Sequence, residues 1–174
     1  MVSLTTIGLI IGLIDFLCVF IVIIYLIMKK VEIARQGNFI FTSLLIHFIF
    51  FGYLSNVYQK SIGEDVLFLY KVMFNSLSFY SAIILFLIVF IMVFREDFFE
   101  YGIRNSMWLV PLIIIESWIW YFFIVDFDIT IIALYFIRYE SYITIVSLLG
   151  INLLAAITGT FAKQKYKEYF KKLK

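Results

Sequence analysis

The sequence predicts an all-α integral membrane protein, a bundle of about five transmembrane helices that forms one domain over residues 1–174. Hydrophobic residues make up 64% of the chain and charged residues 15%, against about 25% charged residues in an average soluble domain. Long apolar runs recur along the chain, and each is long enough to cross a hydrocarbon core of about 30 Å as a helix. A water-soluble fold of this size has no room to bury so much apolar surface.

The predicted spans are apolar segments separated by short polar stretches. They comprise residues 7–28, 39–57, 66–94, 107–125 and 141–161. Helices are expected because the strands of a membrane barrel alternate polar and apolar residues over about ten positions. No basic residue precedes the first run, which favours a retained span over a signal peptide. The apolar segment Ile129–Glu140 carries two charged residues, so we expect an interfacial stretch there rather than a sixth span.

The distribution of basic residues predicts the orientation of the bundle. If the N-terminus lies outside, the basic residues between the first and second spans, those between the third and fourth spans, and the lysines of the tail 162–174 all lie inside. The outside then keeps Lys60, Lys71 and Arg138, beside several acids. Because inner loops of membrane proteins are enriched in Lys and Arg, we expect the N-terminus outside and the C-terminus inside.

The amino-acid composition excludes several kinds of redox and metal site. The chain has one Cys and one His, at Cys18 and His47, which excludes disulfides, redox CxxC motifs and a bis-histidine haem site within the chain. We therefore expect no cofactor or metal to be bound by this chain, and the short loops leave no place for a soluble catalytic domain. The tail interleaves lysines with Tyr166, Tyr169 and Phe170, a composition that favours contact with membrane lipid headgroups over nucleic-acid binding.

Ionisable residues near the middle of the predicted spans are the candidate functional residues. Asp15, His47 and Glu116 fall near the centres of the first, second and fourth spans, and Ser147 and Asn152 lie at comparable depth in the fifth. An ionisable group at that depth normally faces protein or internal water, because exposing it to lipid costs about 2.5–3.5 kcal/mol. Two interpretations remain open: a layer that passes protons, or packing residues satisfied by their neighbours.

The third predicted span is longer than a straight perpendicular helix requires, which implies tilt or a local distortion. Its centre contains Asn75, three serines and Tyr80. Serine hydroxyls can bond backbone carbonyls that a distortion sets free. We therefore predict a break in the regular i to i−4 hydrogen-bond ladder within a turn or two of Tyr80, of which a π-bulge is one form. We include Asn75 and Tyr80 among the candidates for a proton path or its gate.

Two segments resemble a known family. Residues 80–92 read Tyr-Ser-Ala-Ile-Ile-Leu-Phe-Leu-Ile-Val-Phe-Ile-Met, which is similar to the third-helix signature of NADH-quinone oxidoreductase chain 6, called chain J in bacterial complex I. The family has glycine where this chain has Ser81. The last span, through Ala155-Ala156-Ile157 to Ala162-Lys163, resembles the family's final helix with its basic exit.

The resemblance implies a membrane subunit of respiratory complex I that has no catalytic centre of its own. Its expected partners are the quinone-site subunit, the small membrane subunits and the antiporter-like subunits. Tyr80 would lie at the third-helix bulge, whose rearrangement in the family gates a water path. The expected location is the mitochondrial inner membrane, with a bacterial or archaeal plasma membrane as the alternative.

Two other functions remain open at this point. One is a stand-alone small transporter component, for which we would expect a broken helix and a pocket with converging polar groups. The other is an accessory or sensory membrane subunit of a different complex, for which lipid-facing aromatic residues and a basic tail would suffice.

Overall fold

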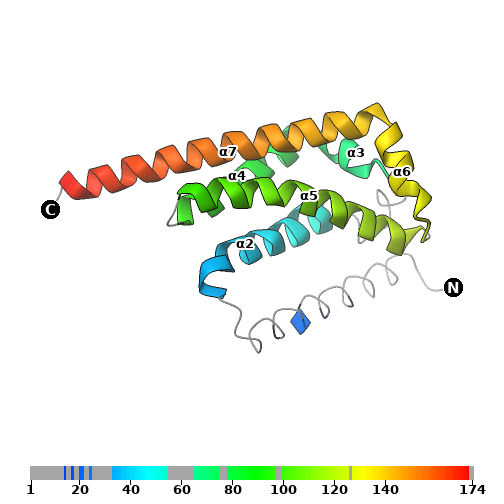
Figure 1. Cartoon of the computed structure of the whole chain (residues 1–174), viewed down its shortest axis with the longest axis horizontal. Coiled ribbons are helices and arrows are strands. Elements are labelled where there is room, and N and C mark those ends of the chain that lie inside the picture. Colours follow the sequence, from blue (N-terminus) through cyan, green and yellow to red (C-terminus); the bar gives the residue numbers. More distant parts are fainter. Residues whose placement is uncertain are drawn as a thin grey trace.

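The computed structural model describes residues 14, 17, 20, 21, 24, 33–54, 65–74, 78–96, 99–125 and 127–172. Within these ranges the backbone is helical almost throughout and contains no strand. The elements are α2 (Ile33–Leu45), η1 (Ile46–Leu54), α3 (Phe68–Phe74), α4 (Ser78–Arg95), α5 (Phe99–Ile124), α6 (Thr130–Ile137) and α7 (Tyr139–Lys172). Figure 1 shows α7 running along one side of the molecule, with α4 and α5 beside it.

Two of these helices are long and apolar enough to cross a membrane. They comprise Glu100–Ile124 within α5 and Tyr139–Lys172, which is α7. They contain the fourth and fifth predicted spans, and the side chains that they turn outward are largely apolar: Phe123 is 74% exposed and Leu154 59%. A soluble monomer rarely presents such a surface to water. The described part of the first predicted span is limited to five residues, all of them helical.

The second predicted span consists of two kinds of helix. The α-helix α2 passes directly into η1, a π-helix of 9 residues with the sequence IHFIFFGYL. In a π-helix each backbone N–H bonds the carbonyl five residues back rather than four, and such segments are rare and often found at functional sites. The distorted backbone therefore lies in the second span.

The third predicted span is divided between α3 and α4. The Ser81 hydroxyl donates a hydrogen bond of 2.8 Å to the Val72 carbonyl, nine residues earlier. In one straight α-helix those residues would be separated by about 13.5 Å along the axis, so α3 and α4 do not continue each other as a single rod. The π-bulge predicted near Tyr80 does not occur in α4, which is regular α-helix from Ser78 to Arg95; residues 75–77 lie outside the described residues.

The stretch after α5 turns the chain back over a short distance. Helix α6 has 8 residues, a length of about 12 Å, which is too short to cross a membrane by itself. The Ser141 hydroxyl at the start of α7 donates to the Tyr135 carbonyl of α6 at 2.6 Å. This bond fixes the corner between the two helices that is visible in Figure 1.

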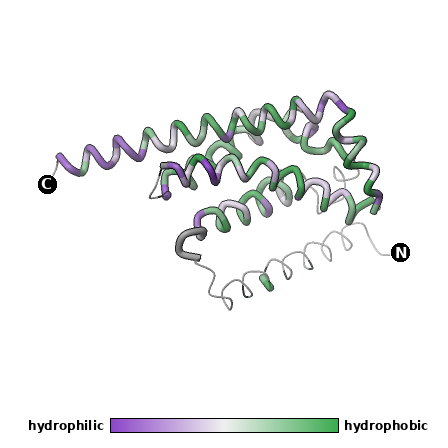
Figure 2. The backbone as a smooth tube through the Cα atoms, viewed as in Figure 1, coloured by the Kyte–Doolittle hydropathy of each residue, from purple (hydrophilic) through white to green (hydrophobic). Residues whose placement is uncertain are grey.

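Small residues bring α4 and α7 close together, and we call this contact the α4–α7 seam: Ala155, Ala156 and Gly159 against Phe90 and Val93. All three small residues are buried. A Cβ atom at Gly159 would lie 3.0 Å from the Phe90 carbonyl oxygen and 3.3 Å from Val93 Cβ, so a side chain there would require α4 and α7 to move slightly apart. Beyond the seam, Figure 2 shows the colour of α7 changing from hydrophobic to hydrophilic toward the C-terminus.

Candidate functional site

The structure brings two of the predicted midspan residues into direct contact. A hydrogen bond joins His47 Nδ1 on η1 to Glu116 Oε1 on α5, across 69 positions of sequence. The two side chains are only 12% and 15% exposed. Helices η1 and α5 are therefore linked through an ionisable pair that is largely withdrawn from solvent.

Aromatic rings hold the imidazole in place. The Trp120 ring stacks on the His47 ring, with centroids 5.7 Å apart and an interplanar angle of 25°. Phe48 meets the same imidazole edge-on at 5.1 Å. Trp120 lies four residues after Glu116, so both project from the same face of α5. One turn of α5 thus supplies both the carboxyl group and the ring that orients its partner.

The periodicity of α5 explains why Glu116 is buried. Leu109, Ile113, Trp120 and Ile124 are all buried, and their spacing of about one helical turn defines a single stripe along α5. Glu116 interrupts that stripe at its middle. A carboxylate in an apolar stripe is costly unless it is paired and hydrogen-bonded, and His47 is the partner that the fold provides.

The pair can hold a proton in two arrangements that have the same net charge. With one proton shared, the site is either an imidazolium beside a carboxylate or a neutral imidazole beside a carboxylic acid, and both arrangements have zero net charge. Transfer of that proton along the His47–Glu116 hydrogen bond leaves the net charge unchanged, which matters where solvation is poor. Uptake of a second proton makes the site positive, so the pair can respond to a proton that arrives from elsewhere.

The other predicted site residues do not join this pair in the described part of the chain. Tyr80, near the start of α4, is 63% exposed and lies on the outer surface of its helix. Asp15 and Asn75 lie outside the described residues. The roles predicted for these three residues stay predictions.

A second buried polar contact lies away from the first. Asn152 of α7 donates from Nδ2 to the Ser106 carbonyl of α5 at 2.9 Å. Ser106 precedes Glu116 by ten residues, or about 15 Å along α5. The expectation that Asn152 shares one layer with Glu116 is therefore wrong: polar groups occupy two depths, because α7 crosses α5 nearer to the start of α5.

The contact between Trp120 and His47 was not predicted from the sequence. The available signal was the spacing of four residues between Trp120 and Glu116 on an otherwise apolar helix. No group of three His, Cys, Asp or Glu side chains suited to a metal ion occurs in the described ranges.

Comparisons with models of known protein families, with curated protein sequences and with solved structures gave no match.

Proposed function

We propose that this chain is a membrane subunit that binds and releases a proton at the His47–Glu116 pair, as part of a larger membrane assembly. The observation that supports the proposal is the direct hydrogen bond between these side chains, each largely buried between apolar helices. Ionisable residues within membrane helices generally pair with one another and mark proton or ion pathways.

The assembly that the sequence favours is the membrane arm of a proton-pumping NADH:quinone oxidoreductase. The support for this choice is the resemblance of residues 80–92 and of the last span to chain 6 of that enzyme. In this proposal the chain carries no catalytic centre and no cofactor, and it lies between the quinone-site subunit and the antiporter-like subunits. The location is then the mitochondrial inner membrane or, alternatively, a prokaryotic plasma membrane.

The proposed topology has five spans, with the N-terminus outside and the C-terminus inside. Helices α5 and α7 supply the two long spans, and α2 with η1, α3 with α4, and residues 7–28 supply the others. In this arrangement the basic end of α7 lies on the inner side. Asp15, Asn75 and Tyr80 are proposed to extend the proton path beyond the pair.

Co-purification tests the assembly. The full chain carrying a C-terminal tag is purified from its native membrane in mild detergent. We expect NADH:quinone oxidoreductase activity and antiporter-like subunits to accompany it. An isolated, monodisperse chain without that activity would exclude the complex I assignment.

Substitution of the pair tests the proton role. In the assembled complex we expect Glu116→Gln and His47→Gln to reduce proton translocation per NADH oxidised, while the subunit content stays unchanged. The matched control is Ser117→Ala, because Ser117 is buried beside Glu116 and its hydroxyl bonds only the preceding turn, at the Ile114 carbonyl. Equal translocation in all variants would assign the pair to packing.

A small transporter component is the second candidate, and the separation of α3 from α4 favours it. The Ser81–Val72 hydrogen bond shows a helix interrupted within a predicted span, and interrupted helices commonly form substrate sites in transporters. Saturable binding of a small polar solute by the purified chain alone would support this candidate over the first.

A further inference from the structure

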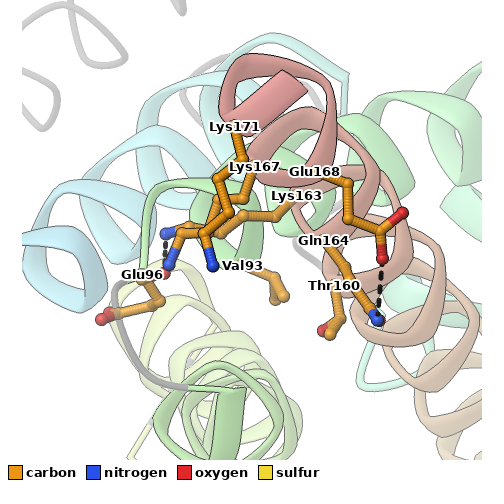
Figure 3. A pocket seen from close by; sticks show the side chains of 8 residues that line it. All are labelled: Val93, Glu96, Thr160, Lys163, Gln164, Lys167, Glu168 and Lys171. Atoms are coloured by element: carbon orange, nitrogen blue, oxygen red, sulfur yellow. Dashed lines mark hydrogen bonds between the residues drawn. The ribbon is translucent and has the colours of Figure 1, made fainter. Parts of the chain in front are cut away.

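A pocket lies where the end of α4 meets the basic part of α7. Its volume is about 560 Å³. Figure 3 shows the lining side chains, which come from these two helices. They are Val93, Glu96, Thr160, Lys163, Gln164, Lys167, Glu168 and Lys171. The pocket is separate from the His47–Glu116 pair, to which it contributes no residue.

Three lysines form one row along this part of α7. Lys163, Lys167 and Lys171 are spaced by four residues, which places them on one helical face at intervals of about 6 Å. Figure 3 shows their side chains lying together on the side of the pocket that contains Glu96, while Gln164 and Glu168 lie on the other side. The row therefore concentrates positive charge at one wall.

The first lysine of the row has a structural role. Lys163 Nζ donates to the main-chain carbonyl of Glu96, directly after the last residue of α4. A lysine that bonds the final carbonyls of a helix stabilises its C-terminus. Lys163 thus links α7 to the end of α4 by a hydrogen bond at one edge of the pocket.

The remaining two lysines are available to a ligand. No hydrogen bond or ion pair is found for Lys167 or Lys171 among the residues that the structure places. The carboxylates of the lining have other donors: Glu96 accepts from Asn105 Nδ2 at 3.3 Å, and Glu168 accepts from Lys165 Nζ at 3.2 Å. The pocket therefore presents two ammonium groups whose charge is not neutralised by a contact within it.

Apolar surface adjoins the other wall of the pocket. Ile157 and Phe161 are 51% and 62% exposed, and their spacing places them on the face of α7 that continues into Gln164 and Glu168. A ligand whose charged end reaches the lysine row and whose hydrocarbon body crosses to this apolar face matches the pocket.

We propose that the pocket binds the phosphate headgroup of an anionic glycerophospholipid, with Lys167 and Lys171 as the phosphate ligands. The acyl chains then lie along the exposed apolar turns of α7 toward the membrane centre. Free phosphate would use only the lysines and would leave the adjoining apolar surface uncovered, which is why a lipid is the better match. The inference rests on the membrane location in the proposed function, and it does not depend on the complex I assignment.

Lipid binding by the full chain in detergent tests the proposal. Retention of phosphatidylglycerol is measured by native mass spectrometry, with phosphatidylcholine as the zwitterionic reference. We expect Lys167→Gln with Lys171→Gln to weaken phosphatidylglycerol binding about thirtyfold, because each basic residue near an anionic headgroup contributes about a fivefold factor. The variant Lys167→Arg with Lys171→Arg keeps the charge and is expected to bind within about threefold of the wild type.

The matched control is Arg104→Gln with Lys172→Gln, which removes the same charge from residues that do not line the pocket. Lys172 lies on the face of α7 opposite the row, and the Arg104 guanidinium of α5 lies over the Tyr101 ring at 4.5 Å. We expect the control to retain phosphatidylglycerol within about threefold of the wild type. Equal losses of lipid binding in the two double variants would show a diffuse effect of positive charge and would contradict the pocket as the binding site. Displacement of the lipid by equimolar glycerol phosphate would show that the site binds a free phosphate compound and would contradict the lipid as its ligand.

The lipid-binding measurement can be interpreted even if the proposed function proves wrong. Resistance of the chain to carbonate extraction reports its membrane location, and co-purification reports its assembly, so each can fail on its own. A chain that is membrane-embedded and travels with no complex I subunit still supports the lipid site if only the pocket variant loses phosphatidylglycerol.

Discussion

The contact between η1 and α5 and the α4–α7 seam hold helices together by different means. The seam relies on small residues, and Gly159 lets α7 lie so close to α4 that an added Cβ would crowd the Phe90 carbonyl oxygen. The η1–α5 contact relies on long side chains, with an ionisable pair and stacked rings bridging the helices. Close apolar packing carries no ionisable group, whereas the net charge of the His47–Glu116 contact is set by the protons that the pair holds. The molecule thus joins one pair of helices through apolar contacts and another through ionisable side chains.

The largest expected effect is at the pair. Glu116→Ala leaves His47 buried without its carboxyl partner, and breaking a buried pair on one side costs about 3–5 kcal/mol of unfolding free energy. The double variant His47→Phe with Glu116→Leu replaces both groups by apolar ones and is expected to recover most of that loss. The measurement is denaturant unfolding of the purified chain in detergent.

The stabilities of these two variants show whether the η1–α5 contact and the α4–α7 seam differ in kind. If the double variant is as unstable as Glu116→Ala, the contact depends on shape in the same way as the seam. If it is stable but inactive in proton translocation, the polar pair is kept for its chemistry.

The next effect is at the seam. Gly159→Leu forces a branched side chain against the Phe90 carbonyl and Val93, and overpacking of this kind costs about 1–3 kcal/mol. The control is Gly150→Ala in the same helix, where an added Cβ meets no atom within 4 Å. We expect that change to be neutral or to stabilise the chain by up to about 1 kcal/mol. Thermal unfolding in one detergent compares the stabilities of the two variants. Similar losses of stability would show that the close approach of α4 and α7 at Gly159 is not the cause.

A smaller effect is expected at Asn152. Asn152→Leu loses the bond to the Ser106 carbonyl, but it also removes Oδ1, which is buried without a hydrogen-bond partner among the described residues. A typical hydrogen bond and an unsatisfied buried polar atom have similar magnitudes and opposite signs. We therefore expect a stability within about 1 kcal/mol of the wild type, by the same unfolding measurement. A loss as large as that of Glu116→Ala would show that α7 also depends on a polar contact.

The smallest effect concerns pH at the surface. Burial raises the pKa of Asp65, but hydrogen bonds from Lys71 and from the Leu67 amide, together with the charges of Lys71 and Arg138, bring this pKa below its usual value of 3.8. A lowered pKa in the folded state gives a contribution to stability that is complete above pH 3.8 and is lost as the pH falls through the lower, folded value. The carboxylate is 38% exposed, so screening limits the contribution to about 0.5 kcal/mol or less.

Asp65→Asn is expected to remove this acid-limb dependence without changing stability at pH 7 by more than that amount. Denaturant unfolding of the wild type and the variant between pH 3 and pH 5 measures this pH dependence of stability. An unaltered pH dependence in the variant would assign the acid response to other carboxylates.

The helical class and the two long apolar helices, α5 and α7, could be predicted because apolar periodicity and length are local properties. The fourth predicted span began at residue 107, whereas α5 begins at Phe99. The extra turns include Glu100 and Arg104, and their charges hid a helix that packs through Gly102 against Val93. Charge marks a membrane boundary well, but it does not mark the end of a helix.

The site was predictable only in part. Equal depth in the membrane suggested that His47 and Glu116 belong together, but depth does not specify which faces meet, which is why Asn152 was misplaced. Serine content led to the prediction of a distortion near Tyr80, yet the π-helix is in η1, where serine is absent. The Ser81 hydroxyl does bond a backbone carbonyl, at Val72, and does so where α3 and α4 separate. Which helix distorts depends on tertiary contacts that single-segment reasoning does not include.

The length of α7 has a mechanical consequence. Its 34 residues form one helix, about 50 Å long, so the lysine segment and the apolar turns belong to the same stiff rod. A partner that binds the C-terminal end and rotates it would turn Asn152 and Gly159 by the same angle. Rotation at that end is thereby transmitted to the interior of the bundle, because the helix contains no hinge to absorb it.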